Sequence, residues 1–282
     1  MALRRILSLI ALVPATAAIW VVAARLNGPG AGPLRTDLPY VVRHPPPNRG
    51  FFVLPTTGLG PGDDVALVHA RGITGRQVGL AIIDRPLLTR HQEYADRLRW
   101  YDEIDTEADE PAGWHSTAVA SIAVGRRVGV APMADLYFVG VGMTWAREPI
   151  GTWRAVVRHA LHSGQTLPLA IRRILDLNRC LPAGRRIRAL SISVGGGRGF
   201  QQAVDEARRE GLFVSAADLR LPRLGPITFA SPAAPDAYTT GEAPAGSWAI
   251  AHMAGRYALA CEEDPAMTPE RFMSKMGIRI VR

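Results

Sequence analysis

The sequence predicts an α/β domain with a mostly parallel β-sheet and helices on both faces of the sheet. Three observations lead to this fold class. From about residue 74 onward, short apolar runs alternate with stretches of helical periodicity, the pattern of parallel strands joined by helices. The chain of 282 residues is long enough to bury one such core. Its composition, 48% hydrophobic and 21% charged, is that of an ordinary globular protein.

Four short apolar runs are predicted to be buried strands. They cover residues 78–83 (VGLAII), 136–141, 189–194 and 211–216. Continuous apolar runs of this length are typical of strands that are buried on both faces of a parallel sheet. The first run ends at Asp84, and in such folds the chemistry gathers outside the carboxyl ends of the strands.

Helical stretches lie between these strands and after them. Residues 114–124 and 247–261 are rich in small residues and suit tightly packed helices. An amphipathic helix is predicted over residues 153–161. Its apolar residues have the spacing i, i+3, i+4, i+7, i+8 that is typical of such a helix; they are Trp153, Val156, Val157, Ala160 and Leu161. Further helices are expected at residues 167–177, 200–209 and 268–276.

The first 27 residues are predicted to be a signal peptide or a membrane anchor. Arg4 and Arg5 precede an apolar run over residues 6–24, whose length lies between a signal-peptide core and a minimal membrane span. The small residues at 15–17 offer a cleavage site, and without cleavage the arginines would hold the segment's start on the cytoplasmic side. A buried N-terminal helix is the alternative. Export predicts an extracytoplasmic protein, either secreted or membrane-anchored.

Residues 28–70 are predicted to be a linker arm, and residues 71–282 the folded domain. Gly and Pro are frequent up to about residue 64 and include the run Pro45-Pro46-Pro47. Such a composition is typical of linkers and loosely packed segments.

The net charge of +8 and the pI of about 10.3 raise the question of an anionic partner. The arginines are scattered along the chain, without a basic stripe and without interleaved aromatic residues. A solvated, Arg-rich surface is therefore the preferred interpretation, and no nucleic-acid partner is predicted. A binder of nucleic acid or of another anionic surface is a distant alternative.

The two cysteines, Cys180 and Cys261, have no metal-ligand spacing and are too few for a disulfide scaffold. They are expected to be buried or free thiols. One disulfide between them is the alternative if the domain is exported.

Three residues stand where a catalytic side chain could act. Asp84 follows the first apolar run, His115 lies near the start of a small-residue helix, and Ser247 is expected at a helix N-terminus. A backbone amide at that terminus can face developing negative charge. Each residue also has an ordinary interpretation: a turn carboxylate, a surface or capping histidine, and an N-cap serine.

The sequence around all three residues resembles the subtilisin-like serine peptidase (subtilase) family. AIID at residues 81–84, followed by His91-Gln92-Glu93, resembles the family's Asp segment. GWHSTAVAS, with GVAPMADLYFV after it, resembles the His segment, and GSWAIAHMAG resembles the Ser segment. ALSISVGGG is similar to the family's substrate-binding strand. The order Asp, His, Ser is that of subtilisin, and the resemblance spans about residues 74–261.

The resemblance implies a subtilisin-like fold and hydrolysis of peptide bonds in a peptide or protein substrate. Ser247 would attack the scissile carbonyl, His115 would carry the proton to the leaving amine, and Asp84 would orient the imidazole. No cofactor is expected. No metal site is expected either, because no acidic cluster has the spacing of a calcium loop.

A substrate-binding segment is implied as well. Ser193, Val194 and Gly195 would pair through their backbone with an extended peptide, and the glycines would allow its close approach. A plain glycine loop at residues 195–197 is the alternative.

The sequence departs from the family pattern next to each triad residue. Arg85-Pro86 follow the aspartate, Ser116 follows the histidine, and Ala118 replaces the family's second histidine. Ile250-Ala251 stand where the family has Thr-Pro. None of these changes removes a triad residue.

A fourth departure concerns the oxyanion hole. Leu219 stands where the family has an asparagine that donates a hydrogen bond, and the neighbouring Asp218 cannot donate one when ionised. Loss of one such donor lowers the rate by about 100- to 1,000-fold. The sequence therefore predicts a serine endopeptidase that is slow. The alternative is a non-catalytic subtilisin-like domain that binds peptides or partner proteins.

Overall fold

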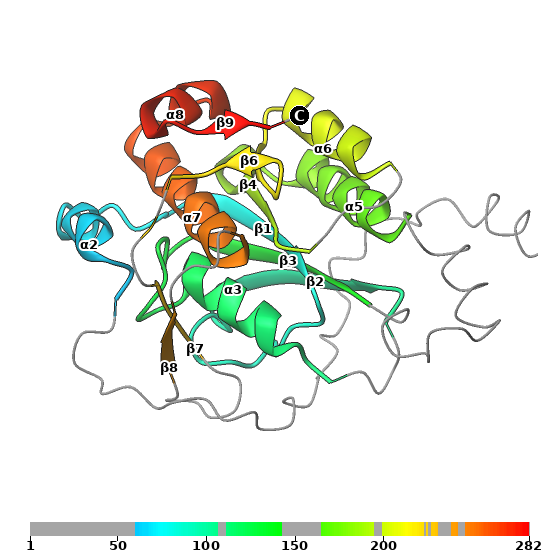
Figure 1. Ribbon diagram of the computed structural model, residues 1–282, viewed down its shortest axis with the longest axis horizontal. Helices are drawn as coiled ribbons and strands as arrows, with labels where there is room; N and C mark the ends of the chain where they lie inside the picture. Colours follow the sequence, from blue (N-terminus) through cyan, green and yellow to red (C-terminus); the bar gives the residue numbers. More distant parts are fainter. Residues whose placement is uncertain are drawn as a thin grey trace, which may run out of the picture.

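A five-stranded parallel sheet forms the centre of the protein (Figure 1). The computed structural model describes residues 60–106, 111–142, 165–194, 199–222, 224, 227–230, 238–241 and 246–281. The strand order is β2-β3-β1-β4-β5, and every neighbouring pair is parallel. The strands are β1 (Gly79–Asp84), β2 (Leu98–Ile104), β3 (Asp135–Val141), β4 (Ile187–Ile192) and β5 (Phe213–Ser215).

The central strand β1 lies at the point where the strand order reverses. After β1 the chain adds β2 and β3 on one side, and later β4 and β5 on the other. At such a point the connections leave in opposite directions and open a crevice outside the carboxyl end of the strand. The crevice next to β1 is therefore the expected place for a functional site, and β1 ends at Asp84.

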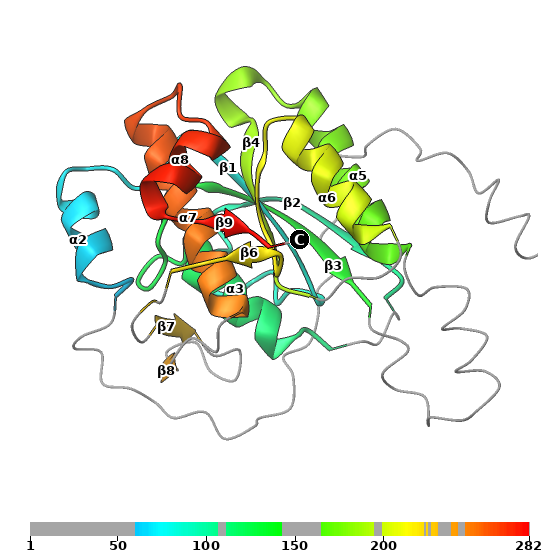
Figure 2. The same cartoon turned by 45° about the horizontal axis from the view of Figure 1, so that its top comes forward.

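Helices cover both faces of the sheet, as Figure 2 shows from a second direction. Helices α3 (Trp114–Val124) and α7 (Ser247–Glu263) pack together on one face, and α5 (Thr166–Cys180) and α6 (Phe200–Arg209) pack together on the other. The predicted α/β class with helices on both faces is confirmed.

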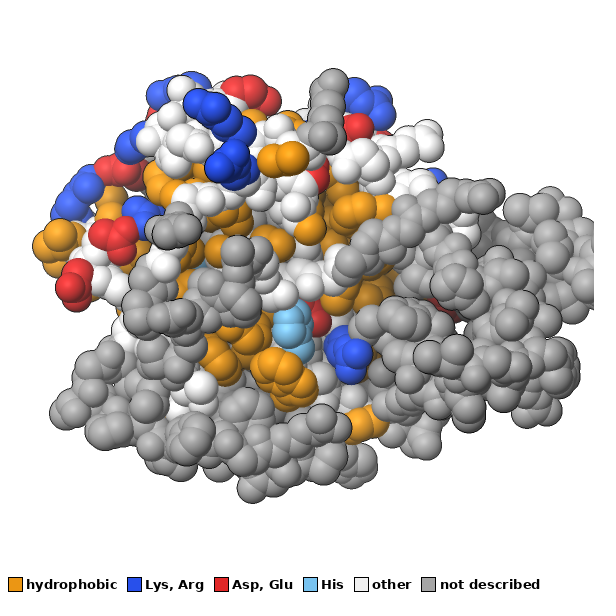
Figure 3. All heavy atoms as spheres, viewed as in Figure 1, with side chains coloured by type: hydrophobic (Ala, Val, Ile, Leu, Met, Phe, Trp, Pro, Cys, Tyr) orange, Lys and Arg blue, Asp and Glu red, His pale blue; other side chains and the backbone are white. Residues whose placement is uncertain are grey.

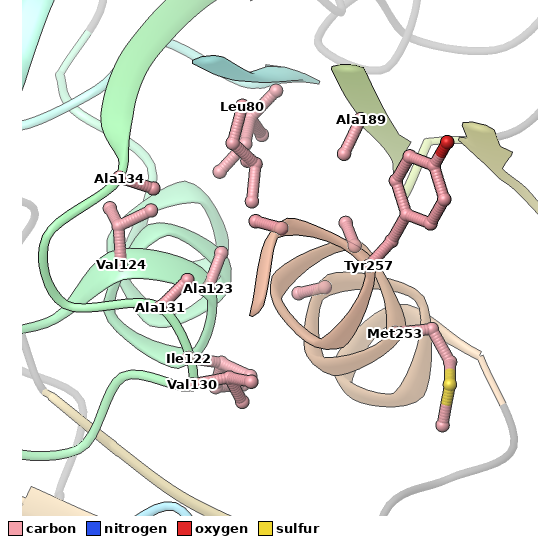
Figure 4. Close-up of a cluster of buried hydrophobic side chains, with 14 of the residues drawn as sticks. Leu80, Ile122, Ala123, Val124, Val130, Ala131, Ala134, Ala189, Met253 and Tyr257 are labelled. Carbon is pink, nitrogen blue, oxygen red and sulfur yellow. The ribbon is translucent and has the colours of Figure 1, made fainter. Parts of the chain in front are cut away.

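The core under α3 and α7 combines small and branched side chains with larger ones such as Met253 and Tyr257 (Figure 4). Leu80 and Ile82 of β1 point to this face, because side chains alternate along a strand. Gly255 lets α7 approach the segment after α3: a Cβ at this position would lie 2.7 Å from the Cβ of Val130. The small residues predicted for these helices thus allow close helix packing.

The other face carries a second core beneath α5 and α6. Ala81 and Ile83 of β1 point here, with Ile171 and Ile174 of α5. All four side chains are fully buried. Because β1 is buried on both faces, its sequence is a continuous apolar run rather than an alternating one.

Most of the predicted elements occur close to their expected boundaries. The predicted strands match β1, β3, β4 and β5, and the predicted helices match α3, α5, α6, α7 and α8 (Pro269–Met276). The helix expected from Trp153 to Leu161 lies outside the described residues. The sequence prediction missed β2, because its charged residues Arg99, Asp102 and Glu103 break the apolar run. In the sheet β2 pairs with β3 alone among the described strands, and such an edge strand tolerates charge.

A helix stands where the end of the linker arm was predicted. Helix α2 covers Asp63–Ala70, and its Val65 is buried in the core under α7. Two ion pairs hold it against α7: Arg256 with Asp64, and Glu263 with Arg71. The two aspartates of the first turn also suit the positive end of the helix dipole. The boundary at residue 70 between the linker arm and the folded domain remains a prediction.

Small elements complete the fold. A 3-10 helix covers Ala183–Arg185, and β6 (Leu219–Arg220) pairs antiparallel with β9 (Arg279–Ile280). Strand β7 (Ile227–Ala230) pairs antiparallel with β8 (Tyr238–Gly241). These strands lie beside the large sheet and not in it.

Both cysteines are free thiols; Cys180 is exposed and Cys261 is buried. The disulfide that was considered as an alternative is therefore absent. Among the helices that the structure describes, none has the length and apolar character needed to cross a membrane. The predicted signal peptide or anchor at residues 1–27 lies outside the described residues.

Candidate active site

Asp84 is buried at the carboxyl end of the central strand. Its side chain is fully shielded from solvent, and Oδ1 accepts a hydrogen bond from the backbone N–H of Arg85 at 2.7 Å. Both carboxylate oxygens also face His115: Nδ1 lies 3.0 Å from Oδ1 and 2.9 Å from Oδ2. A buried carboxylate needs such partners, because an unpaired charge in the interior is costly.

His115 is the second residue of α3, and its side chain is 22% exposed. The contact with Asp84 favours the tautomer that carries its proton on Nδ1, since a carboxylate only accepts hydrogen bonds. Nε2 then has a lone pair that can take a proton. The arrangement gives His115 the chemistry of a general base with a fixed ring orientation.

The start of α3 is tied to the segment after Asp84. Gly113 N–H donates to Pro86 O at 2.7 Å, and Ser116 Oγ lies 2.9 Å from the same oxygen. A Cβ at Gly113 would lie 2.8 Å from the Cβ of Arg85, so glycine is needed for this close approach. Ser116 and Pro86, two departures from the family pattern, therefore help to fix His115 against Asp84.

Ser247 is the first residue of α7 and is partly exposed. Its hydroxyl donates to Ser193 O at 3.4 Å, and the hydroxyl of Ser193 donates to Ser247 O at 3.3 Å. No hydrogen bond joins Ser247 to His115 in the described part of the chain. Contacts between a nucleophile and its base are often loose without substrate. The backbone N–H of Ser247 has no partner within the helix, as is general for the first turn.

Two tryptophans enclose the imidazole of His115. Trp248 stacks on it with ring centroids 5.2 Å apart and an interplanar angle of 29°. Trp114 meets it edge-on at 5.6 Å and also meets Trp248 at 6.0 Å. Because Trp248 directly follows Ser247, this stack brings the start of α7 next to the start of α3. Neither tryptophan was expected in the site from the sequence, although each is the immediate neighbour of a candidate triad residue.

The segment expected to bind substrate begins at the carboxyl end of β4. Ser193 and Val194 are partly exposed, and Ser193 is hydrogen-bonded to Ser247. Gly195 lies outside the described residues. The structure thus brings Ser193 to Ser247 and His115 to Asp84.

Asp218 and Leu219, the residues at the expected oxyanion position, make contacts within the fold. Asp218 forms a bidentate ion pair with Arg208. Nη1 of the arginine donates to Oδ2 of the aspartate at 2.6 Å, and Nη2 donates to Oδ1 at 2.9 Å. Leu219 is 8% exposed, belongs to the core under α7, and pairs with Ile280 through β6 and β9.

Glu93 is a buried carboxylate that connects β8 with the segment after α3. Glu93 is 1% exposed and accepts hydrogen bonds from Tyr238 Oη at 2.7 Å and from Arg127 N–H at 2.9 Å. Burial, with the nearby Glu93 carboxylate, raises the pKa of Tyr238 to about 12. This network joins β8 to the loop that ends α3, at the opposite end of the helix from His115.

Histidine atoms reach the surface near the middle of the face drawn in Figure 3, beside a group of apolar side chains.

A cavity of about 520 Å³ lies elsewhere and is lined by Arg76, Gln77, Met133, Asp135, Pro182, Gly184 and Arg185. It contains none of the candidate catalytic residues. Among the described residues, no group of three or more His, Cys, Asp or Glu side chains is placed to hold a metal ion.

A sequence profile of the subtilase family matches residues 75–218, about half of the chain. The chain belongs to the subtilase family. The matched range contains Asp84, His115 and Ser193, and it ends before Ser247. The family and the fold support a function of the serine peptidase type.

Two further proteins are similar to this subtilase. The subtilisin-like protease PopC of Myxococcus xanthus (strain DK1622) is 33% identical over 126 residues, which cover 40% of this chain and 26% of PopC. The chain therefore aligns with only about a quarter of that relative. A solved cold-adapted subtilisin-like serine proteinase superimposes with a TM-score of 0.48 at 21% identity, over 72% of this chain and 81% of that one.

Proposed function

We propose that this subtilase is a serine endopeptidase with Ser247 as nucleophile, His115 as general base and Asp84 as the residue that orients the base. The observation that carries the proposal is the contact of His115 Nδ1 with both oxygens of the buried Asp84, at 3.0 and 2.9 Å. The position of Ser247 at the start of α7, next to the tryptophan that stacks on His115, supports it.

In the proposed reaction, Ser247 Oγ attacks the carbonyl carbon of the scissile peptide bond while His115 Nε2 takes the hydroxyl proton. His115 then gives that proton to the leaving amine, and an acyl-enzyme ester remains on Ser247. Water attacks the ester with help from the same imidazole and releases the new carboxylate. Asp84 stabilises the imidazolium that forms in both steps.

The proposed site stabilises the oxyanion with fewer hydrogen-bond donors than the family pattern provides. The backbone N–H of Ser247 at the start of α7 can donate to the developing negative charge. The usual side-chain donor is replaced by Leu219, which is buried in the core. Loss of one donor lowers kcat by about 100- to 1,000-fold, so we propose a slow enzyme.

Substrate binding is proposed along Ser193, Val194 and Gly195. Ser193 lies against Ser247, so a peptide strand paired with this segment would end with its carbonyl near the nucleophile. Strand pairing reads the backbone of an extended peptide rather than one particular side chain. We further propose that the protein acts outside the cytoplasm, secreted or tethered by its N-terminal segment, on the strength of the apolar run behind Arg4 and Arg5.

A second candidate function is peptide binding without catalysis. It is favoured by Leu219 at the oxyanion position and by the hydroxyl of Ser247, which donates to Ser193 and not to His115.

Cleavage of a denatured protein by the full-length chain tests the proposal. We expect new termini from casein, identified by mass spectrometry, with one ¹⁸O from labelled water in each new carboxylate. Ser247→Ala should lose this activity by about 10⁴-fold or more. Ser215→Ala, which changes a buried serine at the end of β5, is the matched control and should stay active. A folded wild-type protein that binds peptides and leaves them intact would support the second function instead.

A further inference from the structure

The cavity of about 520 Å³ lies at the amino ends of three neighbouring strands of the central sheet. Its lining residues come from the segments that lead into β1, β3 and β4, and these strands are adjacent in the order β3-β1-β4. Asp84 stands at the other end of β1, so the whole strand separates the cavity from the candidate active site. A cavity of this volume can hold a small organic molecule.

Positive charge is in excess at this cavity. Asp135 is the one carboxylate among the described lining residues, and Nε of Arg99, on β2, donates to its Oδ1 at 2.6 Å. Nε of Arg185 lies 4.0 Å from the other carboxylate oxygen. Arg76 forms no ion pair with a described residue, and its Nε donates to Thr74 Oγ1 at 3.4 Å. Three arginines thus stand against one aspartate, and the field at the cavity attracts anions.

Three side chains offer hydrogen-bond donors to the cavity. They are the guanidinium groups of Arg76 and Arg185 and the amide of Gln77. Within the described part of the chain, the side chains of Arg185 and Gln77 donate no hydrogen bond. A guanidinium presents its N–H groups in a planar fork that matches the oxygens of a carboxylate or a phosphate. The donor set therefore suits an oxyanion.

The backbone that carries Arg76 and Gln77 is held in a defined and uncommon conformation. Oε2 of Glu262, on α7, accepts hydrogen bonds from the backbone N–H groups of Thr74 at 2.6 Å and Arg76 at 3.1 Å. The N–H of Gly75 between them donates to the same oxygen. Gln77 has a φ of 59°, in the left-handed region that residues other than glycine seldom adopt. Such residues cluster at catalytic and ligand-binding sites.

We propose that this cavity binds a small organic anion, whose carboxylate or phosphate group is held by Arg76, Arg185 and Gln77. Met133 and Pro182, which also line the cavity, contact the carbon skeleton of the ligand. An inorganic anion lacks these apolar contacts and binds more weakly, and a neutral analogue lacks the charge-assisted hydrogen bonds. The inference does not rest on the proposed peptidase activity, because no candidate catalytic residue lines the cavity.

Calorimetric titration of the full-length protein at low ionic strength tests this site. Phenyl phosphate and benzoate share an apolar ring and present the two anionic groups, and benzamide is the neutral analogue. We expect at least one of the two anions to bind about 10-fold or more tightly than benzamide, and the tighter of the two identifies the anionic group. Inorganic phosphate, which lacks the ring, should bind more weakly than phenyl phosphate.

Single charge changes give a second readout. Arg76→Gln and Arg185→Gln should each weaken binding of the anion by about 10-fold, whereas Asp135→Asn should strengthen it. Arg209→Gln is the matched control, because it removes an exposed arginine of α6 that does not line the cavity.

Three results would overturn the inference: no saturable binding of either anion, equal binding of benzamide, or the same loss of affinity in Arg76→Gln and Arg209→Gln. Ser247→Ala should bind the anion as wild type does. A protein without peptidase activity that still binds the anion would contradict the proposed function alone, so the two failures are distinguishable.

Discussion

Both carboxylate oxygens of Asp84 lie within hydrogen-bond distance of His115 Nδ1, Oδ1 at 3.0 Å and Oδ2 at 2.9 Å. The carboxylate sits at the end of a strand that is buried on both faces, and the histidine stands at the start of a helix packed against that sheet. Two rigid elements therefore hold the pair, and the orientation of the imidazole does not depend on a flexible loop.

Replacement of Asp84 by asparagine should abolish most of the proposed activity without unfolding the protein. An amide can donate to Nδ1 and thereby favour the tautomer with its proton on Nε2, which cannot act as a base. We expect kcat to fall by about 10⁴-fold. Asp102→Asn is the matched control, because Asp102 lies on β2 and pairs with Arg173. Equal turnover by wild type and Asp84→Asn would show that this carboxylate does not orient the base.

Leu219→Asn should destabilise the protein and should not restore a faster reaction. The leucine side chain is buried in the core under α7, so the amide would replace apolar contacts there. We expect the free energy of unfolding to fall by about 2–5 kcal/mol. Leu219→Met, which conserves volume, should cost less than about 1.5 kcal/mol. Urea unfolding measures both. A Leu219→Asn protein that is as stable as wild type and cleaves peptides faster would refute this assignment.

The ion pair between Arg208 and Asp218 should contribute to stability and not to catalysis. Its side chains are 16% and 12% exposed, and Arg208 also donates to Val214 O at 3.2 Å. A double-mutant cycle with Arg208→Gln and Asp218→Asn should give a coupling energy of about 1–2 kcal/mol. Turnover per folded molecule should not change. A folded Asp218→Asn variant without activity would place this carboxylate in the site after all.

His252 should make the protein less stable as the pH falls from 6.5 to 4. Burial, followed by the positive charge of Arg256, lowers the pKa of His252 from its ordinary 6.5 to about 4. Between these values the unfolded chain binds a proton that the folded chain does not, so stability is complete above pH 6.5 and decreases below it. The loss levels off below pH 4.

The size of this effect is about 3 kcal/mol, since one pKa unit corresponds to 1.36 kcal/mol. Urea unfolding at several pH values measures it, and His252→Gln should flatten the slope in this window. A slope that is the same in wild type and variant would exclude the histidine as its source.

The sequence predicted the sheet well because its strands are buried on both faces. In β1 and β3 every residue is buried, and continuous apolar runs identify such strands. The edge strand β2 was missed, since its charged residues resemble a loop. Helix α2 was missed for a related reason. It has one buried residue, Val65, so no apolar stripe marks it, and its contacts come from distant residues of α7.

The candidate site was predictable in part. Asp84, His115 and Ser247 could be named as candidates because the segments around them resemble subtilase motifs in the expected order, whereas the position of each residue alone is a weak signal. The family profile covers Asp84 and His115. The enclosure of His115 by Trp114 and Trp248 could not be inferred from spacing, because it depends on how α3 and α7 cross. The ion pair of Asp218 with Arg208 likewise joins residues whose contact depends on the packing of α6 beside β5.

The most direct test of the catalytic claim is the reaction of Ser247 with a fluorophosphonate, followed by intact-mass analysis and peptide mapping of the full-length protein. An activated serine forms a stable covalent adduct, and this chemistry does not depend on knowing the substrate. We predict one adduct per chain, located on Ser247, absent in Ser247→Ala and strongly slowed in Asp84→Asn. Folded wild-type protein that remains unlabelled would contradict the assignment of Ser247 as a nucleophile.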